Sequence, residues 1–116
     1  MPIYGCKLTG SIPASFGNLV NLIKFEAYDN KLSGTIPPEL GNLNSLERLD
    51  LFSNQLTGSI PAELGRLRSA LQMMLYNNRL KGTIPPELGD MEKLRYLNVW
   101  DNVLTGTLPP QLARLT

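Results

Sequence analysis

The chain of 116 residues contains no histidine and a single cysteine, Cys6. A catalytic triad that uses histidine, a Cys–His pair and a zinc site built from cysteine and histidine are therefore excluded. Cys6 also has no second cysteine with which to form a disulfide bond within the chain. No asparagine begins an Asn-x-Ser/Thr acceptor for glycosylation.

Strong charge and long apolar runs are missing as well. Eleven Lys and Arg against ten Asp and Glu leave a net charge of +1, without the basic excess of a nucleic-acid-binding domain. No apolar run approaches the roughly 20 residues that a membrane-spanning helix needs. The first ten residues, MPIYGCKLTG, lack the charged and apolar regions of a signal peptide. We therefore expect no nucleic-acid partner and no insertion of this chain into a membrane.

The glycines do not cluster into a phosphate-binding loop, because they recur at a fixed interval of 24 residues. Several other residue types keep the same interval. The columns are asparagine at positions 30, 54, 78 and 102, glycine at 10, 34, 58, 82 and 106, and an Ile-Pro or Leu-Pro step at 12, 36, 60, 84 and 108. One such unit cannot bury its own apolar residues, so the period predicts units stacked into a solenoid.

Residues 46–67 form the clearest unit and read LERLDLFSNQLTGSIPAELGRL. Leu49 and Leu51 alternate with polar residues, which predicts a strand that points both leucines toward the core. Asn54 follows with an amide that offers a donor and an acceptor to the backbone of a turn. Gly58 permits a turn conformation that a Cβ would resist, and Pro61 begins an extended outer segment. Residues 62–67 are too short for a free-standing helix and predict a single helical turn.

We therefore predict one α/β repeat domain over residues 1–116, a leucine-rich-repeat solenoid with a parallel sheet on its concave face. Short 3₁₀ or helical turns are expected on the convex side. Met1, Ile3 and Cys6 occupy strand and asparagine columns of a first, incomplete unit, and no terminal cap is recognisable. In the fourth unit Ala70 replaces a core leucine, a change that typically costs roughly 2–5 kcal/mol. We expect Leu71 to shift inward and refill that gap.

The run Asn-Gln-Leu-Thr-Gly-Ser-Ile-Pro at 54–61, followed by Glu-Leu-Gly, resembles the plant-specific class of leucine-rich repeats. That class is found in ectodomains of receptor-like kinases and receptor-like proteins and in polygalacturonase-inhibiting proteins. The resemblance implies a right-handed superhelix, an extra short strand near each Gly-x-Ile-Pro step and a cell-surface location. It also implies recognition of a protein or peptide on the concave face. No kinase motif is present, so the resemblance implies no kinase activity.

The outward strand columns are the candidate partner-binding surface. An aromatic column repeats every 24 residues through Tyr4, Tyr28, Phe52, Tyr76 and Trp100. These rings either stack to shield the sheet or present an aromatic platform to a partner, and both interpretations stay open. The polar candidates that flank the column are Lys24, Arg48, Tyr96, Glu26, Asp50, Asn98, Asp29, Asn77, Asp101 and Arg79.

Glu26 and Asp50 are the one carboxylate pair to consider for catalysis. Their positions on adjacent strands predict a separation of about 4.8 Å, near the spacing of the two carboxyl groups in a retaining glycosidase. Such acids need a desolvating pocket, and an open sheet offers none. We therefore predict a non-enzymatic module without a cofactor or metal. The alternatives are a scaffold that associates end-on with another protein or copy through its solenoid ends and, more weakly, a glycan-binding or cell-wall protein.

Overall fold

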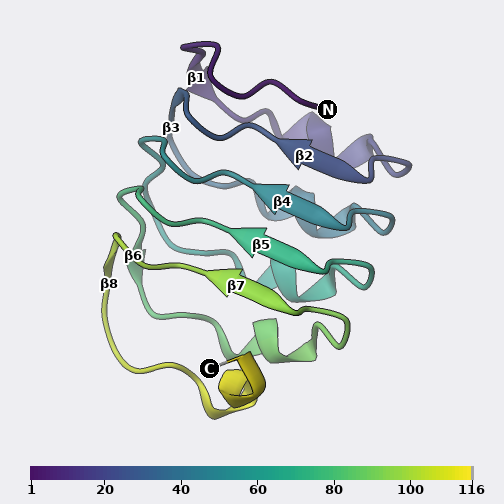
Figure 1. The fold of residues 1–116 in the computed structure, drawn as a ribbon, viewed down its shortest axis with the longest axis vertical. Helices are drawn as coiled ribbons and strands as arrows, with labels where there is room; N and C mark the ends of the chain where they lie inside the picture. Colours follow the sequence, from purple (N-terminus) through teal and green to yellow (C-terminus); the bar gives the residue numbers. More distant parts are fainter. Residues whose placement is uncertain (116) are drawn as a thin grey trace.

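The computed structural model describes residues 1–115 and shows stacked turns of one repeating shape (Figure 1). Each full turn contributes one strand to a parallel main sheet. The strands are β2 (Lys24–Glu26), β4 (Arg48–Asp50), β5 (Gln72–Met74) and β7 (Tyr96–Asn98), paired in that order. Every pair is offset by 24 residues, as Lys24 is beside Arg48 and Arg48 is beside Gln72. The repeat length of the sequence is therefore the register of the sheet.

A second, narrower set of strands lies beside the Gly-x-Ile-Pro and Gly-x-Leu-Pro steps of every turn but the third. It comprises β1 (Thr9–Ser11), β3 (Lys31–Ser33), β6 (Lys81–Gly82) and β8 (Val103–Leu104). β1 pairs with β3 and β6 pairs with β8, while the third turn joins its neighbours only through single bridges at Thr57 and Ser59. The extra strands implied by the family resemblance are thus present. The third turn keeps equivalent backbone hydrogen bonds, from the N–H of Thr57 to the carbonyl of Gly34 at 2.8 Å and from the N–H of Lys81 to the carbonyl of Gly58 at 2.9 Å.

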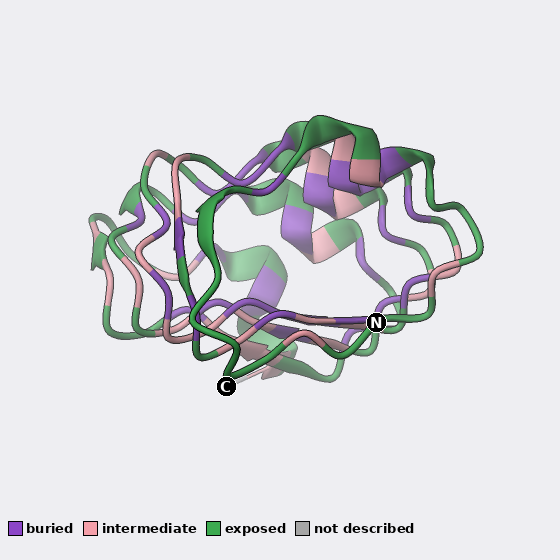
Figure 2. Cartoon of the chain, turned by 90° about the horizontal axis from the view of Figure 1, so that it is seen from above, coloured by how far each residue is buried: buried purple, intermediate pink, exposed green. Residues whose placement is uncertain are grey.

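Five 3₁₀ helices line the side opposite the main sheet, where Figure 2 shows them across the core from the strands. They are η1 (Ala14–Asn18), η2 (Pro38–Asn42), η3 (Ala62–Arg66), η4 (Pro86–Asp90) and η5 (Pro110–Leu115). Pro61 is extended, at φ −64° and ψ 133°, and caps η3. The fixed proline φ favours this entry into a short helix. The predicted convex turns are confirmed.

The asparagine column holds the turns together from inside. The Oδ1 of Asn54 accepts the N–H of Leu32 at 3.0 Å, and its Nδ2 donates to the carbonyls of Ala27 and Leu51, each at 3.0 Å. Asn30, Asn78 and Asn102 repeat this pattern. In the first turn the exposed Cys6 takes the asparagine position, and its Sγ lies 3.3 Å from the carbonyl of Tyr4.

The fourth turn does not repack as expected. Ala70 and Met73 are fully buried, but Leu71 remains 41% exposed. β5 keeps the 24-residue register with both of its neighbours. The prediction that Leu71 moves inward is therefore wrong, because in-register backbone pairing holds its side chain outside the core.

Candidate functional site on the concave face

Four of the five aromatic side chains form a continuous stack across the main sheet. The ring centroids of Tyr4 and Tyr28 are 4.6 Å apart, those of Tyr28 and Phe52 4.4 Å and those of Phe52 and Tyr76 4.6 Å. The interplanar angles are only 3–8°. We call these four rings the stacked ladder. The stacking that one of the two interpretations expected is observed for these four rings.

Stacking decides which part of each ring a partner can reach. Inside the ladder both faces of Tyr28 and Phe52 lie against neighbouring rings, so only ring edges and tyrosine hydroxyls point outward. Ring edges carry partial positive charge, so this strip favours hydrogen-bond acceptors over a second flat ring. Within residues 1–115 no stacked contact extends the ladder to Trp100, which is 72% exposed. The column is therefore a ladder of four rings and one free indole.

Asp50 differs from the expectation of a free outward carboxylate. Its side chain accepts a hydrogen bond from Arg48 at 2.8 Å and one from Gln72 at 2.9 Å, and the residue is 0% exposed. The two long side chains fold over the carboxylate from its own strand and from the next. Glu26 stands beside Asp50 in the strand register as expected. The carboxylate of Asp50 is covered. The sequence-based prediction that Asp50 contacts a partner directly is therefore corrected.

The remaining candidates stay at the surface. Tyr28, Phe52 and Tyr76 are half-buried by stacking, and Glu26, Arg48 and Asn98 are partly exposed. Asn98 is engaged locally, because its Oδ1 accepts the N–H of Trp100 at 3.1 Å. The exposed candidates are Tyr4, Lys24, Asp29, Asn77, Arg79, Tyr96, Trp100 and Asp101.

One of the flanking columns has a backbone role that the sequence analysis missed. Asp29, Ser53, Asn77 and Asp101 all have positive φ angles, between 53° and 57°. Asp and Asn tolerate this left-handed conformation better than most residues. The Asp/Asn/Ser composition of the column was the available signal. Asn77 also donates from Nδ2 to the Oγ of Ser53 at 3.1 Å, so the column links adjacent turns.

Electrostatics single out Tyr28 within the ladder. The pKa of its phenol is raised above the ordinary value of 10.0, chiefly through desolvation by its neighbours and then through the nearby Tyr4. The carboxylates of Glu26, Asp50 and Asp29 add to the shift, since negative charge disfavours a phenolate. The neutral phenol is therefore the form that the folded face maintains.

This shift predicts a loss of stability in base. The folded chain keeps the Tyr28 proton at pH values where the unfolded chain has released it, so stability is intact below the ordinary pKa of 10.0 and falls as pH rises through the raised value. The variant Tyr28→Phe should lose less stability over that interval. Urea denaturation at pH values on either side of 10.0 measures this, with Tyr96→Phe, at a 62% exposed site, as the control. Identical pH dependence in Tyr28→Phe and the unchanged chain would contradict the assignment.

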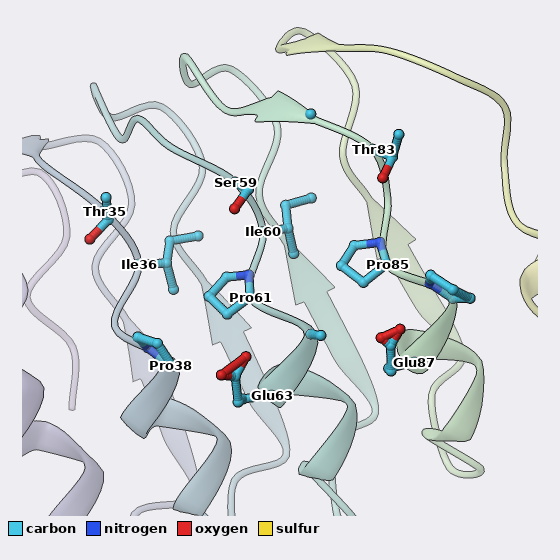
Figure 3. Close-up of a pocket in the computed structure, with 13 residues that line it drawn as sticks. Thr35, Ile36, Pro38, Ser59, Ile60, Pro61, Glu63, Thr83, Pro85 and Glu87 are labelled. Atoms are coloured by element: carbon cyan, nitrogen blue, oxygen red, sulfur yellow. The ribbon is translucent and has the colours of Figure 1, made fainter.

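A second feature, the side groove, lies away from the concave face and was not predicted. It has a volume of about 650 Å³ and is formed where three successive turns run from the narrow strands into η2, η3 and η4. Figure 3 shows hydroxyl, proline and glutamate side chains repeated from turn to turn. The hydroxyl positions 11, 35, 59, 83 and 107 and the glutamates 39, 63 and 87 share the 24-residue period. This signal was visible in the sequence, but its meaning depends on how the turns stack.

Comparison with protein families decides the class of the chain. The family model described as Leucine Rich Repeat matches residues 3–19, 21–43, 45–67, 71–91 and 93–115. The chain belongs to the leucine-rich repeat family. The solenoid described above is the leucine-rich repeat fold, and the five matched segments correspond to its five turns. A comparison with curated protein sequences found no match.

Among solved structures, these leucine-rich repeats are similar to plant receptor ectodomains. The ectodomain of the receptor kinase GASSHO1/SCHENGEN3 from Arabidopsis thaliana, in complex with CASPARIAN STRIP INTEGRITY FACTOR 2, is 45% identical with a TM-score of 0.95. The match covers 98% of this chain and 14% of that one. The BIR3–SERK2 complex from Arabidopsis thaliana gives 36% identity and a TM-score of 0.93, covering 98% of this chain and 61% of that one.

A third similar structure contains a named peptide ligand. The Arabidopsis receptor kinase HAESA, in complex with the peptide hormone IDA and the co-receptor SERK1, is 41% identical with a TM-score of 0.88. The match covers 92% of this chain and 18% of the other chain. This leucine-rich repeat chain thus spans less than two thirds of the length of each of these three structures. The resemblance to the plant class is confirmed.

Two observations concern the predictions about metal binding and membrane insertion. Within residues 1–115, no group of three or more Cys, Asp or Glu side chains has an arrangement that could hold a metal ion. In the same part of the chain no helix has the length and apolar character that a bilayer crossing requires. End-on association and glycan recognition stay predictions.

Proposed function

We propose that this chain is a non-enzymatic module whose concave face binds a protein or an extended peptide. The observation that carries the proposal is the stacked ladder. It lies on the face of a four-stranded sheet, and its two inner rings, Tyr28 and Phe52, present only edges and a hydroxyl. Exposed polar residues such as Lys24 and Asn77 flank it. The similarity to receptor ectodomains solved with a peptide hormone or with co-receptor proteins supports it.

The physical basis is preorganisation. Tyr28, Phe52 and Tyr76 are held by stacking before any partner arrives, so binding need not order them. Lys24 and Arg79 are exposed on the two sides of the ladder, which provides charge at the rim of a less polar strip. Aromatic side chains and a polar rim are common features of protein interfaces. A backbone whose carbonyls point toward the ring edges would suit this surface.

The test uses 12-residue peptides selected from a random displayed library against the full chain. Removing charge with the double variant Lys24→Ala/Arg79→Ala, or removing the exposed ring with Tyr96→Ala, should weaken binding at least about tenfold, or about 1.4 kcal/mol. The matched control, Arg68→Ala/Lys93→Ala, removes the same charge from exposed sites in the loops that follow the 3₁₀ helices. Calorimetric titration measures affinity and thermal melting confirms folding. Equal affinity of all variants, or a loss confined to the control, would overturn the proposal.

A further inference from the structure

The side groove is built from one motif used three times. Thr35, Ser59 and Thr83 place a hydroxyl along one rim, and all three residues are exposed (Figure 3). The opposite rim carries Glu63, which is partly exposed, and Glu87, which is exposed. Between the two rims the floor consists of residues Ile36, Pro38, Ile60, Pro61, Ala62, Pro85 and Pro86, together with Gly82. The groove thus has an apolar floor between a hydroxyl rim and a carboxylate rim.

The shape of the groove is rigid where it touches the core. Ile36, Ile60, Pro61 and Pro85 are buried, so this part of the floor belongs to the packed interior, whereas the floor residues Pro38, Ala62 and Pro86 are exposed. Each proline fixes its own φ and has no N–H to offer, which leaves the rims as the source of hydrogen bonds. A bound chain would therefore contact an apolar strip and bond to either side. No rearrangement of the core is needed to open the groove.

The charge of the lining residues determines which kind of peptide the groove favours. No Lys or Arg lines the groove, whereas two carboxylates do. Within residues 1–115 the one ion pair joins Arg48 to Asp50 on the other face, so neither glutamate of the groove is in an ion pair. Arg66 lines an adjacent hollow together with Glu63 and Glu87, outside the groove itself. The net charge of the whole protein is +1, which gives no general attraction for cations. Any preference for a basic ligand must therefore come from this local surface.

We propose that the side groove binds an extended basic peptide segment of a partner protein. Lysine or arginine side chains of the segment pair with Glu63 and Glu87 through charge-assisted hydrogen bonds, and its backbone bonds to the hydroxyls of Thr35, Ser59 and Thr83. A sugar polymer fits less well, because the 13 lining residues include no aromatic ring on which a sugar could pack. None of these residues belongs to the concave set, so this site and the concave face can fail independently.

The test titrates the full chain with an acetylated decapeptide of alternating lysine and serine at low ionic strength. Saturable binding is expected, and Glu63→Gln/Glu87→Gln should weaken it at least about tenfold. The matched control is Glu47→Gln/Glu92→Gln, which removes the same charge at exposed positions outside the groove. Thermal melting of each variant checks folding, and Thr83→Ala gives a second, uncharged change in the groove that should weaken binding by a smaller factor.

Three results would overturn the proposal. The first is equal weakening in the groove variant and the control variant, which would mean general charge attraction. The second is equal binding of a decapeptide in which alanine replaces every lysine. The third is absence of peptide binding, whether or not a neutral cello-oligosaccharide binds in its place. Loss of selected-library peptides in the concave variants has no bearing on these outcomes.

Discussion

Replacing Asn54 by alanine is expected to lower the free energy of unfolding by about 1–3 kcal/mol, the cost of leaving one buried polar group without a partner. The amide accepts from the N–H of Leu32 and donates to two carbonyls at 3.0 Å, and it is 8% exposed. The carbonyls of Ala27 and Leu51 each keep one other asparagine amide. The N–H of Leu32 therefore accounts for most of the expected loss.

Urea denaturation followed by circular dichroism measures this change. The matched control is Gln55→Ala, which removes a neighbouring, partly exposed amide and should change the free energy of unfolding by less than about 0.5 kcal/mol. A second comparison is Asn102→Ala in the last full turn, where the asparagine is partly exposed and water can replace it. An unchanged denaturation midpoint in Asn54→Ala would show that the asparagine column does not hold the turns together.

The second large effect concerns a glycine inside η3. A Cβ at Gly65 would lie 2.4 Å from the carbonyl oxygen and 2.9 Å from the carbonyl carbon of Glu87, on the next turn. Both atoms belong to the backbone and cannot rotate away, so the turns must separate. We expect Gly65→Ala to cost about 1–3 kcal/mol or more, as overpacking of a tight core does. Gly17 and Gly41 face the same contact with Glu39 and Glu63.

The control for Gly65→Ala is Arg66→Ala, the next residue of the same helix, which is exposed. Alanine favours helix over glycine by roughly 1 kcal/mol in a free helix. Intrinsic helix propensity therefore predicts that Gly65→Ala gains stability, whereas the inter-turn contact predicts that it loses stability. Thermal and urea unfolding of both variants separate the two effects. Greater stability of Gly65→Ala would mean that adjacent helices are not in close contact at this position.

The sequence predicted the features that repeat. Asn54 forms the bonds expected of an inward amide, and Gly58 has a φ of +74°. The strands pair at the 24-residue offset read from the columns. The repeat constrains these features strongly, because the same residue type must make the same contact in every turn. The resemblance to plant repeats likewise predicted the narrow second strands correctly.

Features that depend on neighbouring side chains could not be predicted in this way. Asp50 alternates with Leu49 and Leu51 as an outward residue, yet Arg48 and Gln72 cover it. Trp100 occupies the aromatic column but stays outside the stack. Both outcomes depend on how individual side chains of neighbouring turns meet, which column identity does not specify. The side groove was missed because its hydroxyl, proline and glutamate residues are ordinary surface types. They form a groove only when the turns are stacked.

The central claim is that a partner lies across the concave face, against the edges of the stacked ladder. The most direct measurement is cross-saturation NMR of the isotope-labelled full chain bound to a library-selected peptide. The account predicts that signal loss concentrates on exposed concave residues such as Lys24, Asn77 and Tyr96, with the ladder hydroxyls beside them. Signal loss confined to the 3₁₀ helices, with the concave residues unaffected, would contradict it.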